Sequence, residues 1–328
     1  MSSNPLSAYA CPSLPRDAFA RAALEGLGRA QKFIPSAWLY DQRGSELFEE
    51  ITRLDEYYQT RTEIGILQAC APLLAEAVAP GTVIIELGSG SSRKTPLLLR
   101  ALREPHAYVP VDIAEDFLRA SASALAANFP KLTVLPVVAD FTQPFHLPPQ
   151  VSDTPHPRLG FFPGSTIGNF TPAEAVRFLQ HAARLLGRNR RMVVGVDATK
   201  DAAILVPAYN DSRGITAEFN LNLLRRINLE LGADFDVTAF RHEARYHDKL
   251  GRIEMHLVSQ RKQTVNLLGH RFSFEPEETI HTENSYKYSV PEFQALAASA
   301  GWHPQAVWQD PARRFSVHLL SNIVSEIA

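Results

Sequence analysis

Cysteine is scarce in this sequence, which contains only Cys11 and Cys70. Two isolated cysteines exclude a disulfide framework and a Cys-x-x-Cys metal site, and they are typical of a protein from a reducing compartment. Residues 1–17 contain neither a basic nor a long apolar segment, so they offer no secretory signal. We therefore expect the protein to be cytoplasmic.

Long apolar runs and clusters of one charge are missing as well. The apolar stretch at 71–87 is interrupted by Glu76, Pro80 and Glu86, which leaves it short of the ~18 uninterrupted residues of a membrane helix. The 33 basic and 35 acidic side chains nearly cancel, and no run of Lys and Arg offers a footprint for nucleic acid. We expect neither a membrane nor a nucleic acid as partner.

What is present is an alternation of strand-like and helical segments that starts near residue 83. The 328 residues suffice for one large domain or two ordinary ones. We predict helices over residues 94–102 and 115–128, and strands over residues 83–87, 107–111, 132–138, 159–162 and 192–196. Polar or glycine residues follow each strand. This order favours an α/β fold with a doubly wound sheet, whose ligands lie at the carboxyl ends of the strands.

The alternation stops after Asp197. Residues 202–232 have a helical pattern, and residues 237–246 and 252–259 alternate like the strands of a hairpin. Strand-like segments return at 305–309 and 316–320. We therefore expect an insertion, after which the first fold resumes near residue 286.

The loop after the first predicted strand, residues 86–92, contains two glycines that let a ligand approach the backbone. An NAD fingerprint and a P-loop would each need a further glycine where this chain has Arg93, which disfavours both. Glu86 would repel a pyrophosphate, but it can attract the cationic methionine half of S-adenosylmethionine, whose carboxylate Lys94 can meet.

Two further strand ends carry carboxylates. Asp112 is placed to accept the hydroxyls of a ribose, and the pair Asp140-Phe141 offers an acceptor for the adenine amine and an aromatic face for its ring. Each residue alone could equally be a turn or cap residue. Together with Gly88 and Lys94, at successive strand ends, they favour a cofactor that contains a nucleoside.

Five stretches carry a more specific pattern: residues 38–48 (WLYDQRGSELF), 51–63 (ITRLDEYYQTRTE), 86–95 (ELGSGSSRKT), 163–170 (PGSTIGNF) and 281–285 (HTENS). With them the chain closely resembles the histidine-specific, S-adenosylmethionine-dependent methyltransferases of ergothioneine biosynthesis, from about residue 15 to the C-terminus. The resemblance implies Nα-trimethylation of L-histidine to hercynine, with S-adenosylhomocysteine as second product. It also matches a set of cofactor contacts: Gly88, Lys94, Asp112, Asp140 and Phe141.

The interrupted alternation, together with the positions of the residues that the resemblance matches, predicts a division into two domains. Residues 62–198 and 286–328 would form a Rossmann-like class I methyltransferase core that binds S-adenosylmethionine. Residues 15–61 and 199–285 would form a second, discontinuous α+β domain that binds the substrate.

By the same resemblance, Tyr57 and Asn169 hold the α-amine of the substrate, and Tyr40 lies close to that amine. Methyl transfer needs an unprotonated amine in line with the methyl group. Phenol and amide oxygens suit this, because they accept hydrogen bonds without the negative charge that would favour the ammonium form. The chemistry needs no metal, and we expect none.

The other end of the substrate is matched by a second set of residues. The resemblance implies that Tyr209 meets the carboxylate, that Glu283 and Ser285 hydrogen-bond the imidazole, and that Met255 lines the imidazole pocket. Without the resemblance, Glu283 and Ser285 would more often be a solvated hairpin charge and a turn residue.

Three other functions are open to a sequence of this kind. One is methylation of another aromatic amino acid, such as tryptophan or tyrosine, although a buried Glu283 would need the donor that an imidazole supplies. Another is a non-catalytic module that binds S-adenosylmethionine, and the third is an NAD-dependent oxidoreductase, which Glu86 and Arg93 disfavour. We expect a monomer that takes L-histidine as a small-molecule substrate.

Overall fold

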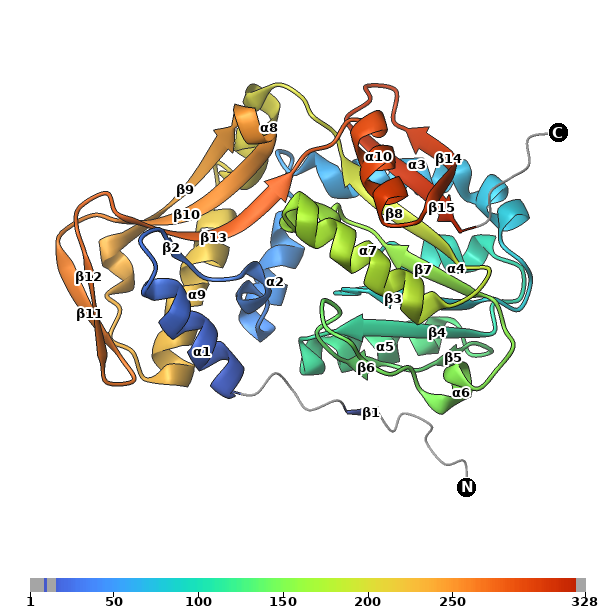
Figure 1. Ribbon diagram of the computed structural model, residues 1–328, viewed down its shortest axis with the longest axis horizontal. Coiled ribbons are helices and arrows are strands. Elements are labelled where there is room, and N and C mark those ends of the chain that lie inside the picture. The colour runs from blue at the N-terminus through green and yellow to red at the C-terminus, as the bar shows by residue number, and fades with distance from the viewer. Residues whose placement is uncertain (1–8, 11–15, 323–328) are drawn as a thin grey trace. The chain divides into compact units, whose positions relative to one another are not determined.

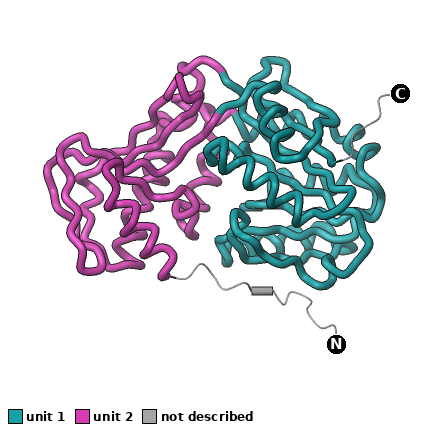
Figure 2. The backbone as a smooth tube through the Cα atoms, in the orientation of Figure 1, with its two compact units in different colours: residues 1–13, 59–199, 287–328 teal, residues 14–58, 200–286 magenta. Residues whose placement is uncertain are grey.

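A computed structural model of the protein describes residues 9–10 and 16–322. Its contacts divide the chain into two compact units, shown in Figure 2. Unit 1 comprises residues 1–13, 59–199 and 287–328, and unit 2 comprises residues 14–58 and 200–286. Which unit binds which ligand stays a prediction.

Unit 1 is built on a nine-stranded sheet with a parallel centre. The central strands run in the order β4 (Ala107–Asp112), β3 (Val83–Leu87), β7 (Arg158–Phe162) and β8 (Arg191–Asp197). The chain proceeds from β3 to one side and later resumes on the other, so the order reverses between β3 and β7. This confirms the predicted doubly wound α/β fold and places its switch point between those two strands.

The edges of this sheet are completed by shorter and antiparallel strands. β15 (Phe315–Ser321) pairs antiparallel with β8, and β14 (His303–Gln309) pairs with β15. The predicted strand over 132–138 is in fact two short strands, β5 (Thr133–Val134) and β6 (Val137–Val138), of which β6 pairs with β1 (Tyr9–Ala10). Pro136 lies between them and lacks the N–H that a continuous strand would donate.

Helices cover both faces of the sheet in unit 1. One core cluster joins the strands to α3 (Tyr58–Ala77), α4 (Thr95–Ala101) and α5 (Glu115–Asn128). Figure 1 shows α7 (Pro172–Leu186) and α10 (Val290–Ser299) on the opposite face. Both begin with a capping box, in which a hydroxyl and a Glu satisfy the first free amides of the helix. A short helix, α6 (Pro149–Ser152), precedes β7.

Unit 2 contains a four-stranded sheet in the order β2 (Lys32–Phe33), β13 (Thr279–Tyr286), β10 (Arg252–Ser259) and β9 (Phe240–His247). A separate hairpin consists of β11 (Gln263–Leu267) and β12 (His270–Phe274). Apolar residues of the sheet share one core with four helices: α1 (Arg16–Leu27), α2 (Gln42–Ile51), α8 (Ala202–Tyr209) and α9 (Ile215–Leu231).

Two predicted elements of unit 2 differ from the structure. The helical pattern at 202–232 forms two helices, because Pro207 lies near the end of α8 and Gly214 takes a left-handed conformation (φ 74°) just before α9. The first strand of the predicted hairpin starts at Phe240 instead of residue 237, because Val237–Ala239 form a turn of 3-10 helix that Asp236 caps.

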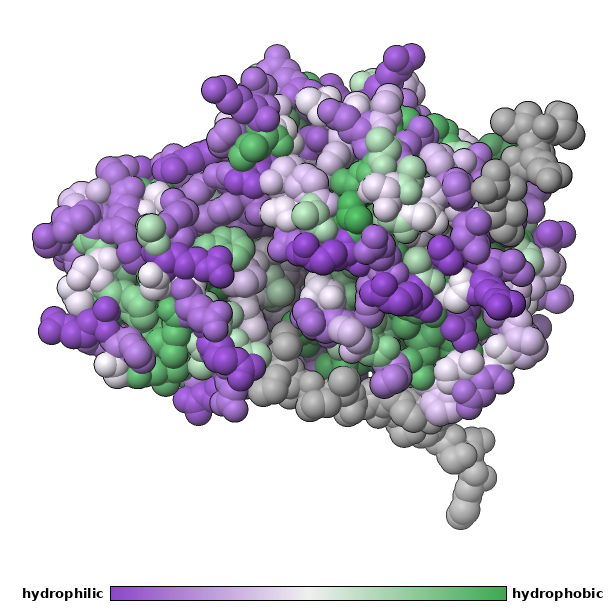
Figure 3. All heavy atoms as spheres, viewed as in Figure 1, coloured by the Kyte–Doolittle hydropathy of each residue, from purple (hydrophilic) through white to green (hydrophobic). Residues whose placement is uncertain are grey.

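The surface of both units is mainly hydrophilic on the face shown in Figure 3, with hydrophobic residues in smaller patches. The most exposed large hydrophobic side chains lie far apart in the sequence: Leu73, Leu229, Leu250, Leu268 and Val307. Among the described residues, no helix combines the length and the apolar character that crossing a membrane requires.

Candidate functional site

The glycine loop of unit 1 begins where β3 ends. The amides of Gly88 and Ser89 both donate to the carbonyl of Val111, at 2.8 and 3.1 Å, which holds the loop against the end of β4. Gly88 has φ 72°, and a β-carbon there would lie 3.1 Å from the ring of Phe141. Glycine is the residue that takes this conformation and this close contact without strain. The structure thus brings two predicted cofactor residues, Gly88 and Phe141, together.

Asp112 ends β4 and binds the same loop. Its Oδ2 accepts a hydrogen bond from the Gly90 amide at 2.9 Å, and its Oδ1 accepts one from the Ala114 amide at 3.1 Å. Burial raises the pKa of this carboxyl despite these hydrogen bonds. Asp112 therefore fixes the shape of the glycine loop, and its contact with a ribose remains a prediction.

Asp140 and Phe141 follow β6. Asp140 accepts hydrogen bonds from the amide and the hydroxyl of Thr142, at 2.9 and 2.6 Å, so it shapes a turn. The ring of Phe141 meets the rings of Phe162 and Phe178 nearly at right angles, with centroids 5.7 and 6.0 Å away. The turn and these aromatic contacts set the position of Phe141, while adenine recognition stays a prediction.

The sequence suggests that Glu86 attracts the methionine half of the cofactor, but the structure encloses this carboxylate within unit 1. Its side chain is buried, and its Oε2 accepts hydrogen bonds from the hydroxyls of Thr95 and Tyr108, both at 2.5 Å. Burial raises its pKa to about 7. Glu86 therefore links the end of β3 to α4 and β4, and its side chain is enclosed beneath the loop.

Lys94 precedes α4 and has a partner that the sequence did not reveal. Its ammonium pairs with the carboxylate of Glu63 at 2.6 Å. Nothing in the local sequence distinguishes Glu63 from other acidic residues of a surface helix. Its position within the stretch 51–63, which carries the family resemblance, is the one signal that could have marked it.

Asn169 lies in the loop that follows β7. Ser165 adopts a left-handed conformation (φ 59°), and its hydroxyl accepts a hydrogen bond from the Asp197 amide at 2.9 Å. A turn of 3-10 helix, Thr166–Asn169, follows directly. Asn169 is half-buried at the end of this turn, on the carboxyl side of the switch-point strand β7. The anchored turn fixes the backbone of Asn169 within unit 1.

In unit 2, three predicted substrate residues meet. The hydroxyl of Tyr209 forms a hydrogen bond of 2.7 Å with the hydroxyl of Ser285, and the rings of Tyr57 and Tyr209 meet edge to face at 6.4 Å. All three side chains are buried. They come from the end of α8, from β13 and from the segment before α3, so the tertiary fold brings them together.

Tyr40 joins this group through aromatic contacts. Its ring lies 5.6 Å from that of Phe48 and 5.4 Å from that of Phe219, and Phe48 lies 6.1 Å from Tyr57. The predicted amine-side tyrosines of unit 2 therefore belong to one continuous aromatic cluster.

Glu283 on β13 and Met255 on β10 are cross-strand neighbours. The register pairs Met255 with Glu283 but His256 with His281, so Thr282 is an extra residue of β13, a β-bulge. Side chains alternate along a strand, so Glu283 shares the face of the buried Met255, whereas His281 lies on the opposite face with His256. Glu283 also shares its face of β13 with Ser285, two residues further along, whose hydroxyl is hydrogen-bonded to that of Tyr209.

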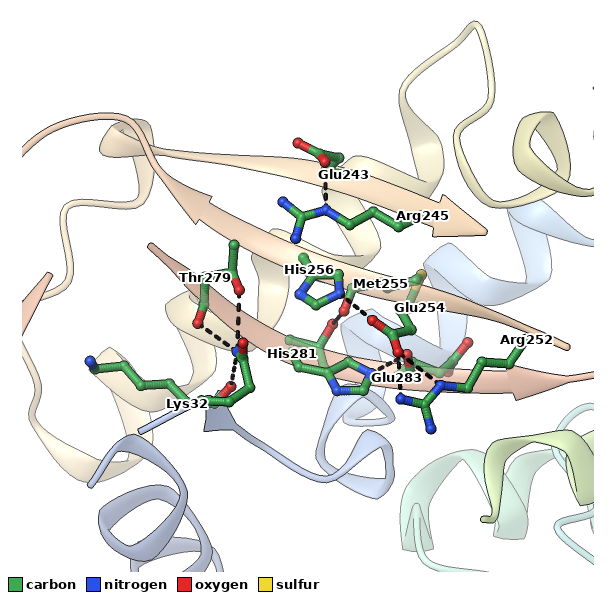
Figure 4. A network of polar contacts seen from close by, with 12 residues as sticks. Lys32, Glu243, Arg245, Arg252, Glu254, Met255, His256, Thr279, His281 and Glu283 are labelled. Carbon is green, nitrogen blue, oxygen red and sulfur yellow. Dashed lines mark hydrogen bonds and ion pairs between the residues drawn. The ribbon is translucent and has the colours of Figure 1, made fainter. Parts of the chain in front are cut away.

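The opposite face of this sheet carries a network of charged residues, drawn in Figure 4. Arg252 donates to Glu254, whose Oε2 lies 2.9 Å from Nε2 of His256, and Nε2 of His281 lies 3.0 Å from the Glu283 carbonyl oxygen. Burial would raise the pKa of Glu254, but the hydrogen bonds from Arg252 and His256 lower it to about 2. Burial lowers the pKa of His256 to about 4.

Glu254, His256 and His281 could be considered as metal ligands, since their candidate ligand atoms lie within 4.8 Å of one another. The two imidazole rings, however, are stacked with an interplanar angle of 20° and centroids 4.9 Å apart. Both carboxylate oxygens of Glu254 already have partners, since Oε1 accepts from Arg252 and Oε2 lies 2.9 Å from Nε2 of His256. The arrangement is that of a hydrogen-bond network.

Comparison with known proteins identifies the family. Residues 19–322 match the family described as histidine-specific methyltransferase, SAM-dependent. The chain is 38% identical to the histidine N-alpha-methyltransferase of Mycolicibacterium smegmatis, over 96% of this chain and 98% of that protein. It is 41% identical to the histidine N-alpha-methyltransferase of Mycobacterium tuberculosis, over 92% and 94%. It is also 35% identical to ergothioneine biosynthesis protein 1 of Neurospora crassa, over 88% of this chain but 33% of that protein. The chain therefore belongs to the histidine-specific, S-adenosylmethionine-dependent methyltransferase family.

Proposed function

We propose that this protein transfers three methyl groups from S-adenosylmethionine to the α-amine of L-histidine. The products are hercynine and S-adenosylhomocysteine, and the reaction is the first step of ergothioneine biosynthesis. The observation that carries this proposal is the grouping of Tyr209, Glu283 and Ser285 in unit 2, in a chain that belongs to a histidine-specific family. Location in the cytoplasm and a monomeric state stay predictions.

Glu283 and Ser285 suit an imidazole. They lie two residues apart on β13, so their side chains share one face of the strand. A carboxylate accepts the N–H of one ring nitrogen, and a hydroxyl can donate to or accept from the other. The hydroxyls of Ser285 and Tyr209 are hydrogen-bonded to each other. Ser285 can therefore contact the imidazole of a bound histidine while Tyr209 contacts its carboxylate.

The amine end needs acceptors without charge. In the displacement, the carbon–sulfur bond of the sulfonium breaks as the amine forms a carbon–nitrogen bond, and positive charge moves from sulfur to nitrogen. We assign Tyr57 and Asn169 to hold the neutral amine, with Tyr40 close to it, because their oxygens accept its N–H groups. Each new methyl group replaces an N–H, so the nitrogen must lose a proton before the next round.

Gly88, Lys94, Asp112, Asp140 and Phe141 would hold S-adenosylmethionine, which supplies the methyl group. The glycine loop fits such a ligand, since a β-carbon at Gly90 would meet nothing within 4 Å and the loop backbone is open there. Lys94 can pair with the carboxylate of the cofactor, and Asp112 can accept its ribose hydroxyls.

Replacement of Asp112 by alanine should weaken cofactor binding about tenfold to a hundredfold. The variant loses the hydrogen bond that shapes the loop at Gly90 and the proposed charge-assisted bonds to the ribose, each worth about 1.5–3 kcal/mol when desolvated. Calorimetry with S-adenosylhomocysteine measures the effect, with Asp153→Ala, an exposed position of the same unit, as control. Unchanged affinity in the Asp112 variant would refute its assignment.

The direct test of the function is a mass spectrum of the products formed from purified protein, S-adenosylmethionine and an equimolar mixture of the common amino acids. We expect trimethylated histidine as the accumulating product. Methylated tryptophan or tyrosine instead would identify the other aromatic substrates. Binding of S-adenosylmethionine without any methylated amino acid would show a module that only binds the cofactor.

A further inference from the structure

Glu63 is a buried carboxylate between two segments that carry predicted ligand contacts. It projects from α3, and its side chain is 1% exposed. Its Oε2 accepts a hydrogen bond from the Gly164 amide at 2.8 Å and pairs with the Lys94 ammonium at 2.6 Å. One carboxylate oxygen of unit 1 therefore joins the start of α4 to the loop that leads to Asn169.

The backbone leaves room for this pair at two glycines. Gly164 has φ 84°, and a β-carbon there would lie 3.3 Å from Nζ of Lys94. A β-carbon at Gly195, on β8, would lie 2.0 Å from Oε1 of Glu63. The carboxylate and the ammonium are thus confined by main chain on both sides, and their positions are closely defined.

Fold stability alone does not require a charge at this place. Removing a carboxylate from water is costly, and a well-packed apolar side chain often stabilises a protein as well as a buried ion pair does. Lys94, in contrast, is still 13% exposed. An ammonium has three N–H donors, so it can bind Glu63 and a second carboxylate at the same time.

We propose that Glu63 is a positioning residue that serves both reactants. Through Lys94 it holds the ammonium that meets the cofactor carboxylate, and through the Gly164 amide it holds the loop that places Asn169 for the substrate amine. The loop half of this inference rests on the proposed function. The Lys94 half concerns cofactor binding alone.

Cofactor binding tests the Lys94 half. Calorimetry gives the affinity for S-adenosylhomocysteine of Glu63→Ala, Lys94→Met and the double variant. We expect Glu63→Ala to weaken binding about tenfold in the wild-type background. Because its effect runs through the ammonium, the loss should shrink to less than about threefold when Lys94 is already methionine. Equal losses in the two backgrounds, or no loss in either, would overturn this half.

Histidine kinetics at saturating S-adenosylmethionine test the loop half. Glu63→Ala should raise the KM for histidine more than Lys94→Met does, because Glu63 still holds the Gly164 amide in the lysine variant. If Glu63→Ala changes the cofactor constant alone, the loop half is wrong. If the purified protein methylates no histidine, the proposed function fails, and the binding cycle still decides the Lys94 half.

Two further variants separate position from folding. Glu63→Gln keeps the shape and an acceptor oxygen, so we expect it to restore the KM for histidine more than the affinity for S-adenosylhomocysteine. It also replaces Glu63→Ala in the binding cycle if the alanine variant does not fold. Restoration of neither constant by a stably folded Glu63→Gln would overturn the proposal. Glu76→Ala, at an exposed position of the same helix, should change neither constant.

Discussion

Replacement of Glu283 by alanine is expected to lower kcat/KM for histidine by about 10³- to 10⁴-fold while leaving cofactor affinity nearly unchanged. Glu283 is buried on β13, where water cannot easily replace a lost partner. A site built to bond a polar group discriminates strongly against ligands that leave its own polar groups unmatched. Wild type should therefore prefer histidine over phenylalanine, and the variant should narrow that gap.

Steady-state kinetics with histidine, tryptophan and phenylalanine measure this effect in wild type, Glu283→Ala and Glu283→Gln. The amide of glutamine still offers an acceptor oxygen. Glu283→Gln should therefore lose less kcat/KM for histidine than Glu283→Ala does. Glu275→Ala changes an exposed carboxylate and serves as the control. Equal losses for all three substrates would mean that Glu283 supports the fold without reading the imidazole.

Replacement of Gly195 by alanine should destabilise unit 1 by about 3–5 kcal/mol, the usual cost of breaking a buried ion pair. The new β-carbon would lie 2.0 Å from Oε1 of Glu63 and 3.2 Å from the ring of Phe315. β8 is paired with β7 and β15 and cannot retreat, so the carboxylate has to withdraw from Lys94. Thermal unfolding should show a midpoint lower by roughly 10 °C.

A matched pair of variants identifies the cause of that loss. Gly65 lies on the same helix as Glu63, is exposed, and a β-carbon there meets nothing within 4 Å. Gly65→Ala should therefore raise stability by up to about 1 kcal/mol, as alanine is the better helix former. Adding Glu63→Ala to Gly195→Ala should recover part of the midpoint if the clash is with the carboxylate. An unaltered midpoint in Gly195→Ala alone would contradict the packing described above.

The parallel core could be predicted because its signals are local. β3 and β4 consist mostly of buried apolar residues, the glycine loop follows β3 directly, and Asp112 ends β4. Where the structure has β5 and β6 in place of one predicted strand, the cause is also local, since Pro136 interrupts the pairing between them. The predicted cofactor residues of unit 1 rest on the same local signals, and Glu86 is enclosed beneath the loop.

Other features could not be predicted because burial there depends on distant partners. β13 contains the polar run 281–285, which resembles a loop, and it becomes a strand because it pairs with β10 and β2. Glu63 looks like an ordinary helical acid, and its burial depends on Gly195, far along the chain. Without the family resemblance, Tyr209 and Ser285 would have had no signal at all.

If Glu283 holds the substrate imidazole, as we propose, the bulge at Thr282 also removes a competitor from within the chain. In a regular strand, His281 and Glu283 would share a face because they are two residues apart. Glu254 and His256 have that spacing on the neighbouring strand, and their side chains lie 2.9 Å apart. A tethered imidazole of this kind competes at an effective concentration of about millimolar or above. The extra residue turns His281 to the other face of the sheet, where its Nε2 lies 3.0 Å from the Glu283 carbonyl oxygen. A protein that we propose to recognise free histidine thus directs the imidazole of His281 away from the face that carries Glu283.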